Sequence, residues 1–390
     1  MWPCKTHHLA ITTNLRALGH RISISQRHTC QLSTMATAHL LPGERLETVN
    51  GAPCLYRYLP VRTINPLIVL IPGGAHNARI FYGGHPGSNP DDFLATRLNK
   101  LGYSVLAISY PLQTEPEIMS PCAPGFRISE WGQQAATVTH KIITEHGLSN
   151  GVVLASWSMG GRILVPFCKT ARQFGLNVEL FVSLSATPGL PGIRPPTPGI
   201  KMTEAGYADF SATYPAFLHQ VHEQLRSKSD RPAFPDDVYR STYFGHTPSS
   251  LLGYGWMYDP QNSGGFVADH GLSDSDAAAN AFEHLPWIAS LIPTSRLDAR
   301  HALCDKSTWN FMLVQGLRAR LEKSGEVDEE RWERVRELVG DAQRVLSEEV
   351  EGTHFFFLGA AGAEVTAQAM VRMIDVAKRL EERLSGLLLP

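Results

Sequence analysis

Ser158 lies in a stretch of sequence that could make it a nucleophile. The segment Ala155–Gly161 (ASWSMGG) follows the apolar run Val152–Leu154 and precedes a segment with helical character. A strand, a tight turn centred on serine and a helix form a nucleophile elbow, which exposes the serine on a strained backbone. Small residues must flank such a turn. Ser156 stands where glycine is usual, and Gly160 lets the helix start close to the strand.

A serine hydroxyl needs an adjacent base to attack at neutral pH, and His354 is the candidate. Of the sixteen histidines, it alone stands just after the last predicted strand, in the turn Gly352-Thr353-His354. An imidazole there could take the Ser158 proton and deliver it to a leaving group. The alternative is a loop histidine beside an aromatic run, and its position favours the base.

A carboxylate should orient His354, and three acidic residues are candidates. Asp298 follows the end of a predicted strand and precedes a predicted helix, so it is preferred. Glu326 and Asp328 are the alternatives, although Asp328 is more simply the N-cap of a helix.

Backbone N–H groups near Ser158 could stabilise a developing oxyanion. The candidates are Met159, directly after the serine, and either Gly74 or Ala75 in the loop that begins Pro72-Gly73-Gly74. Preorganised donors of this kind are worth roughly 3–4 kcal/mol each, which favours a glycine-rich loop at this point.

The order of these features resembles the α/β-hydrolase superfamily over residues 46–385. The resemblance implies acyl-transfer chemistry and a triad in the chain order Ser158, Asp298, His354, as in the esterase branch. Pro72 stands where esterase relatives often have histidine. The interval from Asp298 to His354 is longer than usual there, and an extra helix over residues 328–340 accounts for the excess.

Alternating strands and helices must position these residues. Apolar strands that alternate with helices predict a mostly parallel sheet covered on both faces, with catalytic groups at the carboxyl ends of its strands. The predicted fold class is therefore α/β with a doubly wound sheet, and the resemblance implies the α/β-hydrolase fold with an inserted lid. Strands are predicted at Leu46–Asn50, Cys54–Leu59, Pro66–Ile71, Tyr103–Tyr110, Val152–Ser156, Val178–Ser185, Trp287–Ser295 and Gln343–Val350. Helices are predicted at Asp91–Leu101, Ser129–Glu145 (with Ser129 as N-cap), Gly160–Phe174, Ser307–Lys323, Asp328–Gly340 and Ala363–Leu384.

The chain divides into an N-terminal extension (1–43), a first core segment (44–187), an insertion (188–285) and a second core segment (286–390). The insertion is rich in proline, glycine and aromatic residues, and a long irregular insertion is usually a lid or binding element. The alternative is a subdomain whose aromatic residues only pack on one another. Trp256 and Tyr258 are predicted to bind substrate, because alternate positions of an extended segment project to one side.

Composition excludes several classes of function. The net charge is −2 and the basic residues are scattered, so no nucleic-acid surface is predicted. The longest apolar stretch, 151–168, contains Arg162 and three glycines, so no transmembrane segment is predicted. The chain has no dinucleotide fingerprint or P-loop, and no cofactor is expected. His76 and His85 lack a carboxylate or cysteine partner at ligand spacing, so no metal is expected.

Cellular location rests on the cysteines and on the N-terminal extension. Six cysteines without CxxC spacing favour a reduced, intracellular protein. Residues 1–43 carry basic, serine and threonine residues and no acid, which is typical of a mitochondrial transit peptide. The alternatives are a disordered extension or translation from Met35, with a cytoplasmic protein.

The sequence as a whole predicts a serine hydrolase that cleaves a carboxylic ester or thioester through an acyl-enzyme. The aromatic insertion favours a bulky, apolar small-molecule substrate. The alternatives are an enzyme that releases, transfers or cyclises an acyl chain or cleaves a C–C bond, and a non-catalytic binding protein of the same fold. The substrate and the oligomeric state do not follow from the sequence.

Overall fold

The structure is a computed structural model that describes residues 39–149, 151–190, 193, 200–226, 235–253, 256–259, 261, 266–268, 281–325 and 328–388. Only the backbone is described for Trp256–Tyr258, Phe266 and Ala268. Within the described residues, no helix is both long and apolar enough to cross a membrane.

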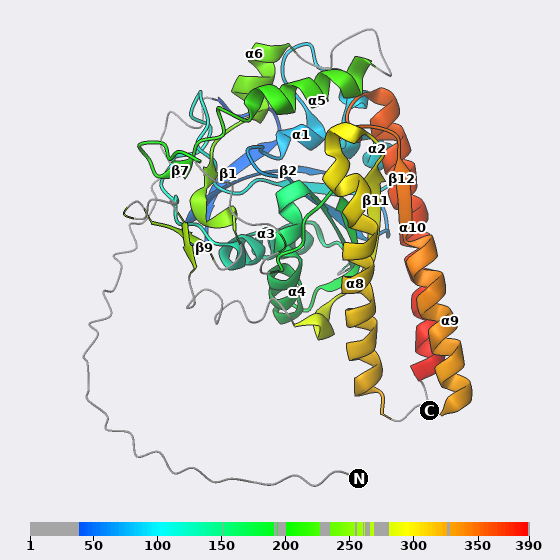
Figure 1. Ribbon diagram of the computed structural model, residues 1–390. Coiled ribbons are helices and arrows are strands. Elements are labelled where there is room, and N and C mark those ends of the chain that lie inside the picture. The colour runs from blue at the N-terminus through cyan, green and yellow to red at the C-terminus, as the bar shows by residue number, and fades with distance from the viewer. Residues whose placement is uncertain are drawn as a thin grey trace, which may run out of the picture.

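A twisted eight-stranded sheet forms the centre of the molecule (Figure 1). The strand order is β1-β2-β4-β3-β5-β6-β11-β12, and the sheet is parallel from β4 to β12, with an antiparallel edge formed by β1 and β2. The strands are β1 (Glu44–Val49), β2 (Ala52–Leu59), β3 (Leu67–Ile71), β4 (Val105–Ile108), β5 (Gly151–Trp157), β6 (Asn177–Leu184), β11 (Trp287–Pro293) and β12 (Ser347–Val350).

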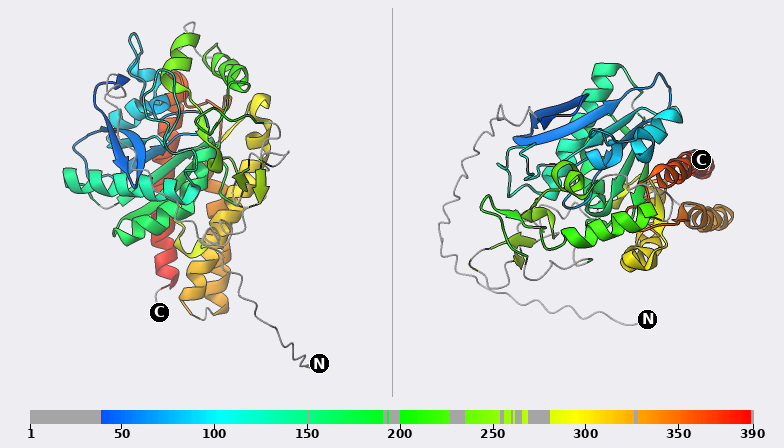
Figure 2. Two further views of the ribbon diagram at one scale, coloured as in Figure 1. Left: turned by 90° about the vertical axis from the view of Figure 1, so that its left-hand side faces the viewer. Right: turned by 90° about the horizontal axis from the view of Figure 1, so that it is seen from above.

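The central strands are apolar along their whole length because helices cover both faces of the sheet (Figure 2). Every residue of β3, β5 and β11 is buried. Two helix pairs form much of the cover, with α3 against α4 and α2 against α10. This confirms the predicted α/β fold with a mostly parallel, doubly wound sheet. These helices are α2 (Leu94–Lys100), α3 (Ile128–His146), α4 (Leu164–Gln173) and α10 (Ala360–Leu388).

The predicted elements all form, but several boundaries were wrong, and the helix predicted from Ser307 begins eight residues earlier, at Ala299. Ser129 is not the N-cap of α3: the helix begins at Ile128, and Glu130 accepts a hydrogen bond from the backbone N–H of Arg127, at the N-cap position. The predicted last strand began too early, because residues 343–345 complete the last turn of a helix that buries Ala342.

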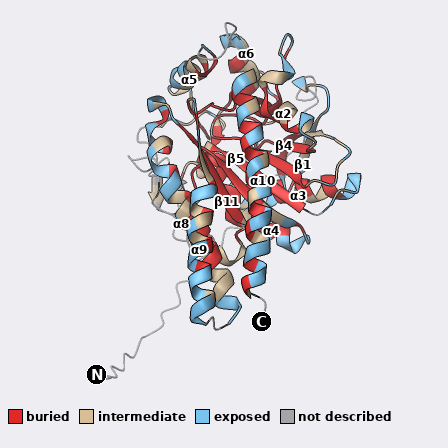
Figure 3. Cartoon of the chain, turned by 90° about the vertical axis from the view of Figure 1, so that its right-hand side faces the viewer, coloured by how far each residue is buried: buried red, intermediate tan, exposed pale blue. Residues whose placement is uncertain are grey.

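Three long helices continue beyond the end of the sheet (Figure 1), and their outward faces are exposed (Figure 3). They are α10, α8 (Ala299–Lys323) and α9 (Glu329–Val345). The extra helix predicted between Asp298 and His354 is α9, and Asp328 caps it by accepting a hydrogen bond from the N–H of Arg331.

The insertion between β6 and β11 contributes small elements around one end of the sheet, with α5 and α6 at the top of Figure 1. Two short antiparallel pairs form, β7 with β8 and β9 with β10. The described elements are β7 (Tyr207–Ala208), α5 (Tyr214–Arg226), α6 (Asp236–Val238), a π-turn (Tyr239–Tyr243), β8 (Thr247–Pro248), β9 (Trp256–Tyr258), β10 (Phe266–Ala268) and 3₁₀ turns at Ser249–Leu251 and Phe282–His284.

The cysteines differ from the expectation of a fully reduced chain. Cys54, Cys168 and Cys304 are free thiols, whereas Cys122 is disulfide-bonded.

Candidate active site

Ser158 directly follows β5 and begins a 3₁₀ turn (Ser158–Ile163) with a left-handed backbone, φ = +52°. This conformation is uncommon for a residue with a side chain and costs of order 1–3 kcal/mol, so the surroundings must hold it. The Ser158 carbonyl accepts a hydrogen bond from the N–H of Thr187 at 2.8 Å. A Cβ on Gly73 would lie 2.6 Å from the Ser158 Cβ, so only glycine fits against the serine.

The helical turn after Ser158 also needs glycine. A Cβ on Gly160 would lie 2.7 Å from the carbonyl oxygen of Pro72, and one on Gly161 would lie 2.8 Å from that of Thr187. The two glycines therefore let the turn pack against the backbones of two loops, as the sequence motif predicts.

His354 and Asp298 form a buried hydrogen-bonded pair, with 2.7 Å between Nδ1 and Oδ2. Burial alone would raise the pKa of the Asp298 carboxyl, but His354, with smaller contributions from His301 and Arg300, holds that pKa below its ordinary value. Asp298 is therefore ionised and accepts from Nδ1–H. Nε2 of His354 is left as the nitrogen that can take a proton. The strand β11 and the 3₁₀ turn Arg296–Asp298 carry this carboxylate.

The loop of His354 is held from two directions. The Trp157 indole N–H, next to Ser158, donates to the carbonyl oxygen of His354 at 2.9 Å. From α5 of the insertion, Gln220 Oε1 accepts the N–H of His354 (3.2 Å), and Gln224 Oε1 accepts that of Thr353 (3.1 Å). Sequence reasoning missed these glutamines, because no local pattern links a helix of the insertion to a turn more than a hundred residues later.

One of the two rival acids has another role in the described part of the chain. Asp328 caps α9. Glu326 lies outside the described residues.

Two of the three predicted oxyanion donors line the same cavity as Ser158, namely Gly74 and Met159. Met159 is the second residue of its helical turn, so its N–H has no acceptor within that turn. The N–H of Ala75 instead donates to Thr247 Oγ1 at 2.9 Å. Gly74 is therefore the better candidate for the second donor.

The cavity beside Ser158 measures about 920 Å³ and brings the two core segments and the insertion together. Asp298 and His354 line it with Ser158. The insertion supplies much of the rest, with apolar side chains and polar ones side by side: Ile193, Ile200, Lys201, Asp209, Phe210, Ser211, Ala212, Thr213, Phe217, Gln220 and Leu252. The side chains of Trp256 and Tyr258, predicted to bind substrate, lie outside the described part of the chain.

His76 and His85 are each hydrogen-bonded to a tyrosine of the insertion, His76 Nε2 to Tyr239 at 2.5 Å and His85 Nδ1 to Tyr243. His76 Nδ1 also lies 2.8 Å from the carbonyl oxygen of Gly74. Burial lowers the pKa of His76 to about 3, so the ring is neutral, donates from Nδ1 and accepts at Nε2. These contacts tie the Gly74 loop to the insertion.

Among the described residues, one cluster has the donor set of a metal site. Ligand atoms of Asp298, His301 and His354 lie within 4.8 Å of one another. Hydrogen bonds already account for their arrangement, since His354 pairs with Asp298 and His301 Nδ1 lies 2.9 Å from Asp305 Oδ1. We therefore interpret the cluster as paired histidines and carboxylates.

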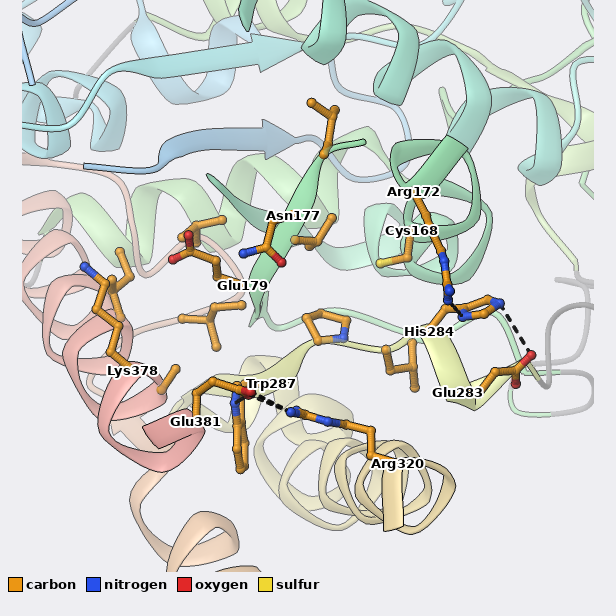
Figure 4. Close-up of a pocket in the computed structure, with 18 of the residues that line it drawn as sticks. Cys168, Arg172, Asn177, Glu179, Glu283, His284, Trp287, Arg320, Lys378 and Glu381 are labelled. Atoms are coloured by element: carbon orange, nitrogen blue, oxygen red, sulfur yellow. Dashed lines mark hydrogen bonds and ion pairs between the residues drawn. The ribbon is translucent and has the colours of Figure 1, made fainter. Parts of the chain in front are cut away.

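A second cavity, of about 640 Å³, lies at the amino-terminal ends of β6 and β11, away from Ser158 (Figure 4). Two of its charged groups pair with each other: Glu381 accepts from Arg320 at 2.7 Å and from the Trp287 indole N–H at 2.8 Å. Its one thiol, Cys168, has its pKa raised to about 12 by burial and is a poor nucleophile. The Ser158 cavity is therefore the better candidate site of the two.

Comparison with known proteins returns solved structures of the same fold class. They include a thioesterase domain from the curacin biosynthetic pathway (12% identity over 84% of this chain and 98% of that chain, TM-score 0.39). A soluble variant of monoglyceride lipase from Saccharomyces cerevisiae is 12% identical over 88% and 95% of the two chains, with a TM-score of 0.44. An esterase from Pyrobaculum calidifontis is 15% identical over 88% of each chain, with a TM-score of 0.37. No family model and no curated protein matches the chain.

Proposed function

We propose that this chain, which has the α/β-hydrolase fold, is a serine hydrolase that cleaves a carboxylic ester or thioester through an acyl-enzyme. One observation carries the proposal. Asp298 and His354, joined by a buried hydrogen bond of 2.7 Å, line the same cavity as Ser158, whose backbone is held at φ = +52°. An ionised carboxylate, an oriented imidazole and a half-buried serine that lines a cavity supply the three parts that nucleophilic acyl transfer requires.

The proposed reaction begins when the Ser158 oxygen attacks the carbonyl carbon while His354 Nε2 takes the hydroxyl proton. The carbonyl oxygen becomes an oxyanion, which the N–H groups of Gly74 and Met159 stabilise. The tetrahedral intermediate then expels the alcohol or thiol, which takes the proton from His354. Water then attacks the carbonyl carbon of the acyl-enzyme and gives a proton to His354; when the bond to the Ser158 oxygen breaks, His354 returns that proton to Ser158 and the acid is released.

The cavity supports an apolar acyl or alcohol group of moderate size. Phe210, Phe217 and Leu252 give it an apolar wall. Lys201 and Arg300 also line it, so a polar or anionic group on the substrate is compatible with the site.

Covalent labelling of the purified protein tests the proposal. A fluorophosphonate should add one equivalent to Ser158, and Ser158→Ala should abolish both labelling and ester hydrolysis. Ser156→Ala is the matched control, because Ser156 lies two residues earlier, in β5, and its buried hydroxyl has no hydrogen-bond partner among the described residues. We expect the fluorophosphonate to label Ser156→Ala to the same extent as the unmodified protein.

The same experiment separates the alternative functions. A folded protein that no fluorophosphonate labels would overturn the enzymatic proposal in favour of a binding protein. If labelling occurs, mass spectrometry of the products formed with and without added alcohols distinguishes hydrolysis from acyl transfer.

A further inference from the structure

The geometry points to Tyr110 and Thr247 as positioning residues that aim the Gly74 N–H into the oxyanion hole. Tyr110 follows β4, and Thr247 begins β8 of the insertion. This inference rests on the proposed function, because it assigns a role in the stabilisation of the oxyanion. It concerns two hydroxyl groups outside the triad and outside the lining of the cavity.

The two hydroxyls form a chain of hydrogen bonds that begins and ends on the oxyanion loop. Thr247 Oγ1 lies 2.9 Å from the backbone nitrogen of Ala75 and 3.1 Å from the Tyr110 hydroxyl. The Tyr110 hydroxyl lies 3.0 Å from the carbonyl oxygen of Gly73. Tyr110, Thr247 and Ala75 are fully buried, so these bonds do not compete with bulk water.

The direction of every hydrogen bond in the chain is determined. The Ala75 N–H can only donate, so Thr247 accepts from it. The Gly73 carbonyl can only accept, so the single hydroxyl proton of Tyr110 points to it. Thr247 therefore donates its own proton to the Tyr110 oxygen. Burial raises the pKa of Tyr110, so the phenol keeps the proton that this arrangement needs.

Tyr110 controls the orientation of the candidate oxyanion donor through one peptide group. The carbonyl of Gly73 and the N–H of Gly74 belong to the same peptide, and in a planar trans peptide they point in opposite directions. A hydrogen bond that holds the Gly73 oxygen on one side therefore turns the Gly74 N–H to the other. Gly74 lines the Ser158 cavity, and Gly73 packs directly against Ser158.

The backbone groups of Ala75, the next residue, are also hydrogen-bonded, so the loop is constrained on both sides of Gly74. Ala75 has φ = +61°, a left-handed conformation that is strained for alanine. Its N–H is bonded to Thr247, and its carbonyl accepts the N–H of Gly245 at 2.9 Å. Both partners belong to the insertion. The insertion is thus part of the catalytic centre in this proposal, and the segment around β8 does not move as a lid.

Three substitutions and one control test the inference in the full-length protein. Tyr110→Phe removes the donor to Gly73, Thr247→Val removes the hydroxyl with little change in shape, and Thr247→Ser restores a hydroxyl. The control is Tyr56→Phe, which removes a buried phenol that bonds to Glu47 in β1, away from the loop. We measure kcat and KM for a short ester, the melting temperature, and the affinity for an alkyl boronic acid. Boron binds the Ser158 oxygen, and the tetrahedral anion mimics the intermediate.

We expect Tyr110→Phe and Thr247→Val to lower kcat at least about tenfold with KM changed less than about twofold, because misaimed donors weaken only the transition state. Boronic acid affinity should fall by the same factor as kcat/KM. Thr247→Ser should recover most of both losses, and Tyr56→Phe should change neither. A merely structural role would lower the melting temperature and leave boronic acid affinity and kcat of the folded fraction unchanged.

The failure of this inference differs from the failure of the proposed function. If the unmodified protein is not labelled at Ser158 and does not bind boronic acid, the serine mechanism itself is wrong. If the unmodified protein reacts and Tyr110→Phe and Thr247→Val bind boronic acid as tightly, only the positioning role is overturned. Should Tyr110→Phe fail to fold, the pair Thr247→Val and Thr247→Ser decides the question.

Discussion

Single residues at this site combine roles that their positions in the chain do not reveal. Asp298 is both the end of a 3₁₀ turn and the hydrogen-bond acceptor of His354. His76 is both a ring in an aromatic cluster and a donor to the Gly74 carbonyl, with its ring 4.9 Å from that of Trp157. Contact with His354 keeps Asp298 ionised and burial keeps His76 neutral, and in each case the protonation state decides which atoms can donate.

Asp298→Asn tests the assignment of the triad acid. An amide can present its N–H₂ to the imidazole and favour the wrong tautomer, so we expect kcat to fall by about 10³–10⁴-fold with little change in melting temperature. Steady-state kinetics and thermal unfolding check this. Asp328→Asn is the control, because Asp328 caps an exposed helix, and it should retain near-normal turnover. A severe loss at Asp328 with an active Asp298→Asn would move the role to Asp328.

The low pKa of the buried His76 predicts how the stability of the protein depends on pH. Its pKa is about 3 in the folded protein, below the unfolded value of about 6.5. Between these values the unfolded chain binds a proton that the folded protein refuses, so stability is full above about pH 6.5 and falls as the pH drops toward 3. His76→Asn, which keeps a donor for Gly74, should show a shallower fall. Urea unfolding at pH 7.5, 6 and 5 gives the free energy of unfolding of both proteins. The same dependence on pH in the unmodified protein and in His76→Asn would contradict the prediction.

At the scale of elements, the insertion takes part in two different tasks. The part that includes the π-turn and β8 packs against the oxyanion loop through Tyr239, Tyr243 and Thr247. The part around Phe210 and α5 lines the cavity and holds the His354 loop. The proposed lid function therefore belongs to the second part, where side chains face the space that a substrate would fill.

Phe210→Ala tests substrate contact by the insertion. Loss of a partly buried ring should weaken binding of a long acyl chain by roughly 1 kcal/mol, about fivefold in KM, and leave an acetate ester nearly unaffected. KM values across a series of ester chain lengths measure this. Trp256→Ala and Tyr258→Ala, at the positions predicted from the sequence, belong in the same series. Equal effects on the KM of short and long esters would indicate that these residues of the insertion only pack within the protein and do not contact substrate.

On the scale of the whole molecule, residues that precede the boundary predicted at residue 43 bond to the first core segment. Arg79 and Glu44 form a buried ion pair with 2.7 Å between Nε and Oε1. The same guanidinium donates to the carbonyl oxygen of His39 at 2.7 Å, and the N–H of Leu41 donates to Glu44. Residues 39–43 thus complete the hydrogen bonding of a buried charge pair.

Two truncations test this boundary. A protein that begins at Met35 should keep its melting temperature and turnover, because it retains His39 and Leu41. A protein that begins with an initiator methionine followed by Glu44 leaves Arg79 without one acceptor, so we expect it to lose about 1–3 kcal/mol of stability. Chemical unfolding of both proteins measures the effect. Equal stability would restore the boundary at residue 43.

The sequence alone determined the local features that depend on short spacings. Apolar runs and helical periods predicted the sheet, and small residues around Ser158 predicted the tight turn, because sterics within a few residues decide both. Chain order after the last strands also singled out Asp298 and His354 as candidates. The boundary at residues 343–345 was missed, because burial of Ala342 in a tertiary contact extends α9 against the local strand pattern.

Only the tertiary structure decided which distant groups meet. The hydrogen bond between Asp298 and His354 spans 56 residues, and the bond between Tyr110 and Thr247 spans 137. A polar side chain that bonds across such an interval leaves no periodic signal in the sequence, since its partner depends on how the sheet and the insertion pack. Burial then keeps His76 neutral. The Ala75 N–H is bonded to Thr247, which leaves Gly74 as the candidate oxyanion donor in this loop.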